Sequence, residues 1–376
     1  MEQYYQGRSQ CPVHGSTINL SADEYNAPRY GLTDEQMQRV AADLKQNPGT
    51  LMQEELYNYT RQTLLKGIDR VYGRLPHDHP QFENVHQMQE NMARFAGYKT
   101  AWQTADIVAG KNIHGVDAKY NVNWLRTEYV HTVRSARAAQ QWHQLQADKD
   151  LYPYLEYMPS TAAEPRGEHQ KLYGVIKPVD DPFWDTWLPP NDWGCRCSVQ
   201  QVRADNSTRP VPDDIKQPPA TMRNNPGRTG RIITDRHPMI ANVPQRMQQR
   251  IDPEYERLNR RAIRQEVMEY AKKELIGKEF LSKDNKQLSL SNLSIRKMLS
   301  QESDKINLKN KLVYDIKEIV RAMDYVKSEL PKGERMSNIA QTHIYNYSFK
   351  GINVRLTVWE LKGKSPFYIL HSMNIQ

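Results

Sequence analysis

Apolar residues in the first 150 positions recur every three to four residues, which is the spacing of one face of an amphipathic helix. Two Ser/Thr-x-x-Glu/Gln patterns, Thr33 with Gln36 and Thr50 with Gln53, match capping boxes and predict where two helices begin. Two further helices are predicted over about 82–108 and 122–146. The first part of the chain is therefore predicted to be mainly helical.

The hydrophobic pattern changes twice after these helices. The Pro-bounded run DLYPYLEYMP, residues 150–159, has a shorter period and predicts a strand. From about residue 205 the chain is rich in Pro, Asn and Gly and has little periodicity, which predicts a linker over 205–250. Three parts follow from this pattern: a first domain over 1–204, the linker, and a second domain over 251–376.

The second domain changes from a helical to an alternating pattern. A helix is predicted over about 309–330, where apolar residues share one face. In the tail, Gly351 and Gly363 mark turns between strands of a predicted three-stranded antiparallel meander. One strand alternates between an apolar set and a more polar set: Ile352, Val354, Leu356 and Val358 against Asn353, Arg355, Thr357 and Trp359. The predicted fold class is multidomain α+β, with a mainly helical first region and a small α+β C-terminal domain.

Composition and charge narrow the class of protein. The chain has 376 residues and a mean hydropathy of -0.83, and no apolar run approaches the roughly 18 residues of a membrane span, so no membrane partner is expected. Residues 251–376 hold 23 Lys and Arg against 16 Asp and Glu, which is nearly all of the net charge of +8. This asymmetry fits either a nucleic-acid partner or an ordinary solvated surface.

Two of the three cysteines, Cys195 and Cys197, stand one residue apart in WLPPNDWGCRCS. The third, Cys11, is distant, so a disulfide framework is excluded and a reducing compartment is indicated. The C-x-C pair fits packing of small apolar side chains in a buried turn. Zinc ligation with His169 is the alternative, but a fourth ligand is not evident, and no metal or cofactor is expected.

The order of several motifs resembles one family. WLRTE at 124–128, then Arg166 and His169 with a following leucine and glycine, then the Pro-Pro and C-R-C turn, resemble the Mu F-like minor head, or head morphogenesis, proteins of tailed phages and prophages. The stretch NNPGRTGRIITDRHPMI, residues 224–240, is also similar to related proteins. Some members carry an additional C-x-x-C before the histidine, which this chain lacks.

The resemblance implies a structural role. It implies assembly of the head near the portal, with portal and capsid or scaffold proteins as partners, DNA as a further partner, and a location in the virion or in the bacterial cytoplasm during assembly. The motif residues implied are Arg126, Glu128, Arg166, His169, Cys195 and Cys197. We expect Arg166 and Glu128 to form an ion pair with each other, and His169 to pack near the thiols. The alternative is that Arg126 and Glu128 lie on a helix surface.

The C-terminal layout, helices followed by a strand meander, resembles the barnase/EndoU/colicin/RelE-like (BECR) nuclease folds that are fused to phage head proteins. Metal-independent RNA cleavage needs a base, an acid and a cation for the phosphorane charge. The candidate catalytic residues are His343, Tyr345, Arg355 and His371, and the candidates for nucleic-acid binding are Lys350, Arg355 and Trp359. We expect the sheet face that bears Arg355 to bind RNA. The alternative is a docking module without catalysis.

Overall fold

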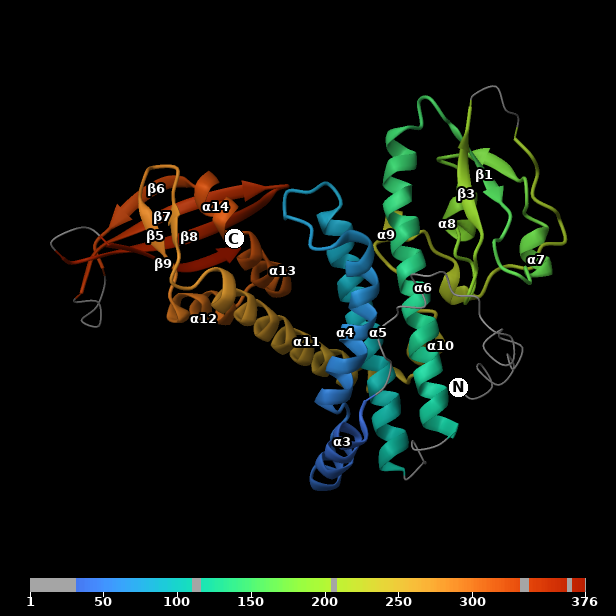
Figure 1. Ribbon diagram of the computed structural model, residues 1–376, viewed down its shortest axis with the longest axis horizontal. Coiled ribbons are helices and arrows are strands. Elements are labelled where there is room, and N and C mark those ends of the chain that lie inside the picture. The colour runs from blue at the N-terminus through green and yellow to red at the C-terminus, as the bar shows by residue number, and fades with distance from the viewer. Residues whose placement is uncertain (1–31, 110–115, 204–207, 332–337, 364–366, 376) are drawn as a thin grey trace. The chain divides into compact units, whose positions relative to one another are not determined.

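The computed structural model describes residues 32–109, 116–203, 208–331, 338–363 and 367–375. These form two compact units, one made of residues up to Leu75 with Gln81–Leu258, the other of Pro76–Pro80 with Asn259–Gln376 (Figure 1). Within the described residues, no helix combines the length and the apolar character needed to cross a membrane. The chain is a mixed α+β protein with a helical first region and a C-terminal sheet, as the sequence predicts.

Long helices build the first unit (Figure 1): α3 (Asp34–Gln46), α4 (Glu54–Tyr72), α5 (Phe82–Val108) and α6 (Val116–Ala147). The capping box of Thr33 and Gln36 is confirmed. The second box is wrong, because Gln53 is itself the N-cap of α4 and its side chain accepts from the backbone N–H of Leu56. Helix α4 packs against α5 and α6. At Gly67 an added Cβ would lie 3.0 Å from the Thr132 methyl, so glycine permits the close approach of α4 and α6.

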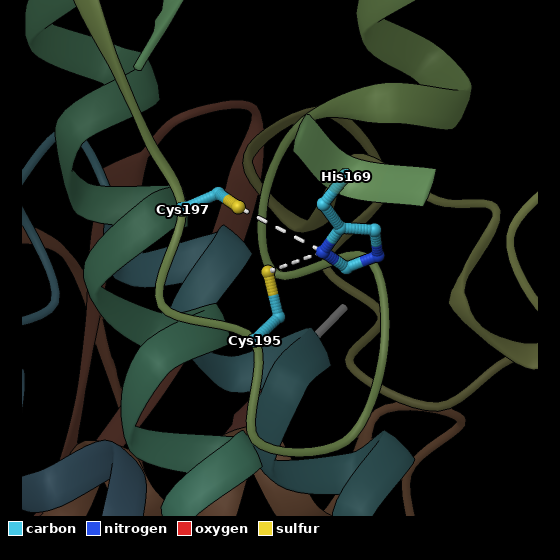
Figure 2. A group of neighbouring side chains, drawn as sticks. All are labelled: His169, Cys195 and Cys197. Carbon is cyan, nitrogen blue, oxygen red and sulfur yellow. Dashed lines mark hydrogen bonds between the residues drawn. The ribbon is translucent and has the colours of Figure 1, made fainter. Parts of the chain in front are cut away.

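A small antiparallel sheet follows the helices, with β1 (Tyr154–Met158) between β2 (Ile176–Pro178) and β3 (Ser198–Val202). This confirms the predicted strand. Short helices α7 (Gly167–Gln170) and α8 (Phe183–Trp187) lie between the strands in sequence. Tryptophans of α8 pack with residues of β1 and β3 in one core. The segment between α8 and β3 carries Cys195 and Cys197 (Figure 2).

The predicted linker over 205–250 is wrong, because most of this stretch belongs to the first unit. It contains η1 (Ala220–Met222), α9 (Pro226–Thr229) and α10 (Pro238–Ala241). Five of its apolar side chains are buried in the main helical core: Met222, Ile232, Ile233, Met239 and Ile240. The boundary between the units falls later, after Leu258. Pro, Asn and Gly here serve as turn and cap residues of an ordered, non-periodic segment, not as a flexible connection.

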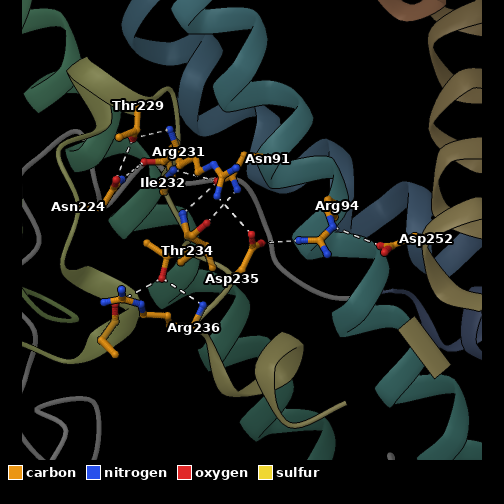
Figure 3. Close-up of polar contacts among 12 residues, drawn as sticks. Asn91, Arg94, Asn224, Thr229, Arg231, Ile232, Thr234, Asp235, Arg236 and Asp252 are labelled. Carbon is orange, nitrogen blue, oxygen red and sulfur yellow. Dashed lines mark hydrogen bonds and ion pairs between the residues drawn. The ribbon is translucent and has the colours of Figure 1, made fainter. Parts of the chain in front are cut away.

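Side-chain hydrogen bonds fix this segment to α5 (Figure 3). The Asn91 carboxamide accepts from the backbone N–H groups of Ile232 and Ile233, at 2.9 and 3.0 Å, and donates to the Ile233 carbonyl at 2.8 Å. Arg94 bridges Asp235, at 2.5 Å, and Asp252, at 3.2 Å. Backbone N–H and C=O groups of this segment that pair with no strand thereby form hydrogen bonds with a side chain of α5.

His237 in this segment gives the first unit an expected sensitivity to acid. The side chain is buried, its Nδ1 accepts from the Met239 backbone N–H at 3.2 Å, and burial lowers its pKa to about 3. The unfolded chain has a pKa near 6.5 at this group and takes up the proton first, so stability falls as the pH drops below about 6.5. From pH 7 to pH 5 the expected loss from this histidine is about 2 kcal/mol.

His237→Asn tests this, because asparagine can keep the N-cap acceptor and cannot titrate. Six of the seven tryptophans lie in the first unit, so urea unfolding followed by their fluorescence reports on it. The loss of unfolding free energy between pH 7 and pH 5 is expected to be smaller in the variant. An equal loss in both chains would show that His237 is already protonated in the folded state.

The second unit is a six-stranded sheet with helices. Helix α11 (Gln245–Glu274) leads into it, and the strand order is β4-β5-β9-β8-β7-β6. All neighbouring pairs are antiparallel except β5 with β9. The meander is confirmed in its three long strands, β7 (Ile339–Phe349), β8 (Ile352–Leu361) and β9 (Phe367–Ile375). The short strands were not predicted: β4 (Glu279–Leu281), β5 (Gln287–Ser289) and β6 (Asp324–Glu329).

The helix predicted over 309–330 is wrong in its second half. The stretch is divided into α13 (Ile306–Lys311), η2 (Leu312–Asp315) and α14 (Ile316–Ala322), after which β6 pairs with β7. Met323 is buried as the helical pattern required, but Val326 is 48% exposed. Pairing with β7 outweighs the helical spacing of the last apolar residues, since strand preference depends on cross-strand neighbours.

The alternation along β8 is confirmed. Val354, Leu356 and Val358 are fully buried, while Arg355 and Thr357 between them are half-buried. They share one core with apolar residues of α11, α12 (Asn292–Ser300) and α14. Directly opposite residues of antiparallel strands lie on the same sheet face. The register therefore determines which side chains of β7 and β9 lie on the face that this core covers.

Candidate functional sites

The imidazole of His169 and the thiols of Cys195 and Cys197 meet in the first unit (Figure 2). His169 Nδ1 lies 3.6 Å from Cys195 Sγ and 3.7 Å from Cys197 Sγ, and the three atoms are all within 4.8 Å of one another. His169 and Cys195 are buried and Cys197 is half-buried. The sequence associated these residues as alternative zinc ligands and through the family resemblance, and the structure brings them together.

The loop that carries the thiols is held by side chains from three elements. Arg134 of α6 donates to the Cys195 carbonyl at 2.6 Å, and Arg166 donates to the Trp193 carbonyl at 2.6 Å. Tyr157 of β1 donates to the Asn191 side-chain oxygen at 2.7 Å. Gly194 has a φ of +71°, a left-handed conformation that glycine adopts readily. The positions of both thiols are therefore fixed by the fold.

The two thiols are electrostatically unequal. A hydrogen bond from Cys197 holds the pKa of Cys195 well below its usual value, against the effect of burial, and His169 adds to this lowering. The same hydrogen bond and burial raise the pKa of Cys197. The titrations of the two thiols are therefore linked through their mutual hydrogen bond.

The expected ion pair between Arg166 and Glu128 is wrong. Glu128 accepts from Lys99 Nζ at 2.8 Å, with the two side chains 3% and 0% exposed. Burial raises the pKa of Glu128, and Lys99 opposes that effect. Arg166 instead lies 3.6 Å from Asp192. The alternative, a surface position, is also wrong for Glu128; Arg126 is half-buried. Lys99 lies on α5, 29 residues away, so no local pattern marked it as the partner.

A second cluster lies in the C-terminal unit, where the turn between β4 and β5 meets β7. Tyr345 donates to Asp284 Oδ2 at 2.9 Å, and Lys286 Nζ is 2.9 Å from the Tyr345 hydroxyl and 2.7 Å from Asp284 Oδ2. Hydrogen bonds from Lys286, Ser282 and Tyr345 outweigh burial and lower the pKa of Asp284 to about 2. Burial raises the pKa of Tyr345 to about 12. Asp284 is therefore an anion and Tyr345 a neutral donor near neutral pH.

His343 forms the other half of this cluster. Its Nε2 is 2.9 Å from Glu360 Oε2 and its Nδ1 is 2.6 Å from the Ser328 hydroxyl. Two tyrosine rings adjoin both halves. Lys286 Nζ lies 5.2 Å from the Tyr325 ring centroid and 5.7 Å from that of Tyr368, while the His343 ring lies 6.4 and 5.8 Å from the same rings. We call these eight residues the sheet-end cluster: Asp284, Lys286, Tyr325, Ser328, His343, Tyr345, Glu360 and Tyr368.

The structure divides the predicted catalytic residues between two faces. His343 lies opposite Val358 and Tyr345 lies opposite Leu356, so both side chains are on the buried face of the sheet. Arg355, next to Leu356, points to the other face. His371 also lies there, because its ring stacks on Trp359 with centroids 3.4 Å apart, and burial lowers its pKa to about 4.

The four predicted catalytic residues therefore do not form one site, although Arg355 and Trp359 share a face as predicted. Lys350 is also distant from His343, because it sits in the turn after β7. Seven residues of strand separate it from His343, which corresponds to roughly 23 Å. Of the residues that the sequence selected for this unit, His343 and Tyr345 share one face, while Trp359 and His371 contact each other on the opposite face.

Several cluster residues were not selected from the sequence. Asp284 and Lys286 belong to a short hairpin that has little periodicity. Its turn carried one signal, an Asp-Asn pair, and Asn285 does adopt a positive φ of 61°. Glu360 is the last acid of the chain, which alone gives it no role. Ser328 was hidden by the incorrect helix over 309–330.

Comparison with known proteins supports a likeness for each unit. Residues 84–200 match the family described as Phage Mu protein F like protein, and residues 259–368 match the family described as Large polyvalent protein-associated domain 3. The chain is 39% identical over 80 residues to the "Putative capsid assembly protein F" of Escherichia phage Mu. It is 42% identical over 78 residues to the "Mu-like prophage FluMu F protein" of Haemophilus influenzae.

These alignments are partial. Each covers 21% of this chain and 18% of the relative. No solved structure matches the chain significantly. The family match over 84–200 spans α5, α6 and the three-stranded sheet, and therefore contains the thiol–imidazole cluster and the Lys99–Glu128 pair.

Proposed function

We propose that the first unit is the head-assembly part of a phage or prophage minor head protein. The match over residues 84–200, together with a relative that is named for capsid assembly, carries this proposal. The matched residues form one continuous scaffold of two long helices and a sheet, so the likeness covers a folded element and not an isolated motif. The proposed partners are the portal and the capsid or scaffold proteins, and the proposed location is the virion interior near the portal.

Co-expression of the full chain with its cognate portal, scaffold and capsid proteins tests the proposal. Procapsids separated by sedimentation are expected to contain the chain, and purified chain is expected to retain the portal in a pull-down. Omitting the chain is expected to lower the yield of normal heads. Absence of the folded chain from procapsids and virions alike would contradict the proposal.

We propose that the second unit binds and cleaves RNA at the sheet-end cluster. The observation that supports this is the placement of a cation, Lys286, and a carboxylate–imidazole pair, Glu360 with His343, against the same two tyrosine rings. Aromatic rings beside a cation suit base stacking and phosphate contact. Tyr325 is 49% exposed, which leaves its ring accessible to a base.

The chemistry assigned to these groups is transesterification. Glu360, oriented by His343 Nε2, accepts the proton of the ribose 2′-hydroxyl as the 2′-oxygen attacks phosphorus. Lys286 stabilises the negative charge of the phosphorane. The bond from phosphorus to the 5′-oxygen breaks, and the carboxylate–imidazole pair returns the proton to that oxygen. The products are a 2′,3′-cyclic phosphate and a 5′-hydroxyl.

The full chain with a labelled single-stranded RNA provides the test. Binding is expected to weaken steeply as salt rises, because each neutralised phosphate releases counterions. Cleavage is expected to proceed in EDTA and to give cyclic-phosphate ends, since Lys286 supplies the positive charge. Salt-sensitive binding without cleavage would leave the unit a nucleic-acid docking module. A folded chain that neither binds nor cleaves RNA would contradict both versions.

A further inference from the structure

The thiol–imidazole cluster has the arrangement of three ligands around a common centre. A tetrahedral Zn²⁺ with Zn–S near 2.3 Å and Zn–N near 2.0–2.1 Å separates nitrogen and sulfur ligands by about 3.6 Å. The two separations from His169 Nδ1 to the sulfurs are 3.6 and 3.7 Å. All three atoms also lie within 4.8 Å of one another, so a single ion can reach each of them.

Hydrogen bonding alone accounts poorly for this convergence. An imidazole nitrogen that lacks a proton has one lone pair and can accept from one thiol. Both sulfurs nevertheless lie at the same nitrogen, at nearly equal distances. A cation at the centre would be ligated by the nitrogen and both sulfurs together, and thiolate with imidazole is a donor set that favours zinc among the common divalent ions.

The surroundings supply the rigidity that a metal site needs. Arg134 and Arg166 hold the carbonyls of the loop that carries the thiols, and Tyr157 holds the side chain of Asn191. His169 sits on α7, which begins immediately after Arg166. Arg166 therefore caps the short helix that carries one ligand and fixes the loop that carries the other two, as supporting residues around metal ligands do.

We propose that His169 Nδ1, Cys195 Sγ and Cys197 Sγ bind one Zn²⁺ ion. Within the described part of the chain, no other His, Cys, Asp or Glu completes the group, so the fourth position is open to a water molecule. The ion would join α7 to the loop before β3. This replaces the packing role that the sequence favoured for the C-x-C pair.

Zinc content of the full-length chain, purified without an immobilised-metal step, tests the proposal. About one zinc per chain is expected after dialysis. His169→Asn and Cys197→Ser are expected to lower this content several-fold, whereas His371→Asn, in the other unit, is expected to leave it unchanged. Far-ultraviolet circular dichroism of each variant shows whether it remains folded.

Cobalt provides a second measurement that needs no variant. The unsubstituted chain, stripped with a chelator and loaded with Co²⁺, is expected to show a sulfur-to-cobalt charge-transfer band and strong tetrahedral d–d bands, which one equivalent of Zn²⁺ removes. Stripping is also expected to lower the melting temperature of the first unit, because bound metal stabilises the folded state by mass action. Zinc well below one per chain, together with cobalt spectra that lack the thiolate band, would overturn the proposal.

Discussion

Replacing Lys99 with methionine is expected to lower the free energy of unfolding of the first unit by about 3–5 kcal/mol. Lys99 and Glu128 are almost completely buried and lie 2.8 Å apart at Nζ and Oε1. Lys99→Met keeps the apolar stem and removes the ammonium, so Glu128 is left as a buried charge without its counterion. Tryptophan fluorescence during urea unfolding measures the loss, since six of the seven tryptophans report on this unit.

Two further variants identify the cause of that loss. The double variant Lys99→Met with Glu128→Leu removes both charges and is expected to recover most of the stability, because an apolar pair of similar volume often equals a buried ion pair. Arg39→Met breaks the exposed Arg39–Glu55 pair and is expected to have little effect, because solvent screens exposed pairs. A single variant that unfolds like the unsubstituted chain would show that Glu128 is protonated and that the pair is not ionic.

The elements with strong local sequence patterns were predicted correctly. The helical stripe of α5 predicted its bounds at Phe82 and Val108, and the alternation of β8 correctly separated its buried from its more exposed residues. Predictions failed where distant contacts decide the local structure. Residues 220–240 resemble a linker in sequence because their ordered structure depends on contacts with Asn91 and Arg94 of α5. Val326 continues the helical spacing of apolar residues, but it lies in β6, which pairs with β7.

In the candidate sites too, local patterns were predicted correctly and contacts between distant residues were not. Cys195 and Cys197 are separated by one residue in the sequence, and His169 was associated with them as a possible zinc ligand and through the order of motifs. Their meeting depends on the fold of β1–β3, which the sequence did not specify. In the second unit the alternation rule assigned Arg355 to the less buried face correctly. The alternation rule could not show that polar side chains cluster near His343 on the other face, because Lys286 belongs to a hairpin some 60 residues earlier in the chain.

Glu360→Gln is expected to lower the rate of RNA cleavage by roughly 10²–10⁴-fold, the usual range for removing a general base. Glutamine has nearly the same shape and can still hydrogen-bond to His343, so the fold and the affinity for RNA are expected to persist. Lys286→Met is expected to lower the rate by about 10²–10³-fold, as loss of a group that stabilises transition-state charge does. It should also weaken binding and reduce its salt dependence, because Lys286 would contact phosphate in the proposed site.

Arg355→Ala and His371→Asn are matched controls, because these residues lie on the opposite face of the same sheet. Cleavage rates measured at saturating RNA separate the chemical step from binding. If the sheet-end cluster is the site, the two controls retain the rate and Glu360→Gln loses it. The reverse result, an inactive Arg355→Ala beside an active Glu360→Gln, would return the site to the face that the sequence selected. It would then leave the His343–Glu360 pair as a structural contact that joins β7 to β8.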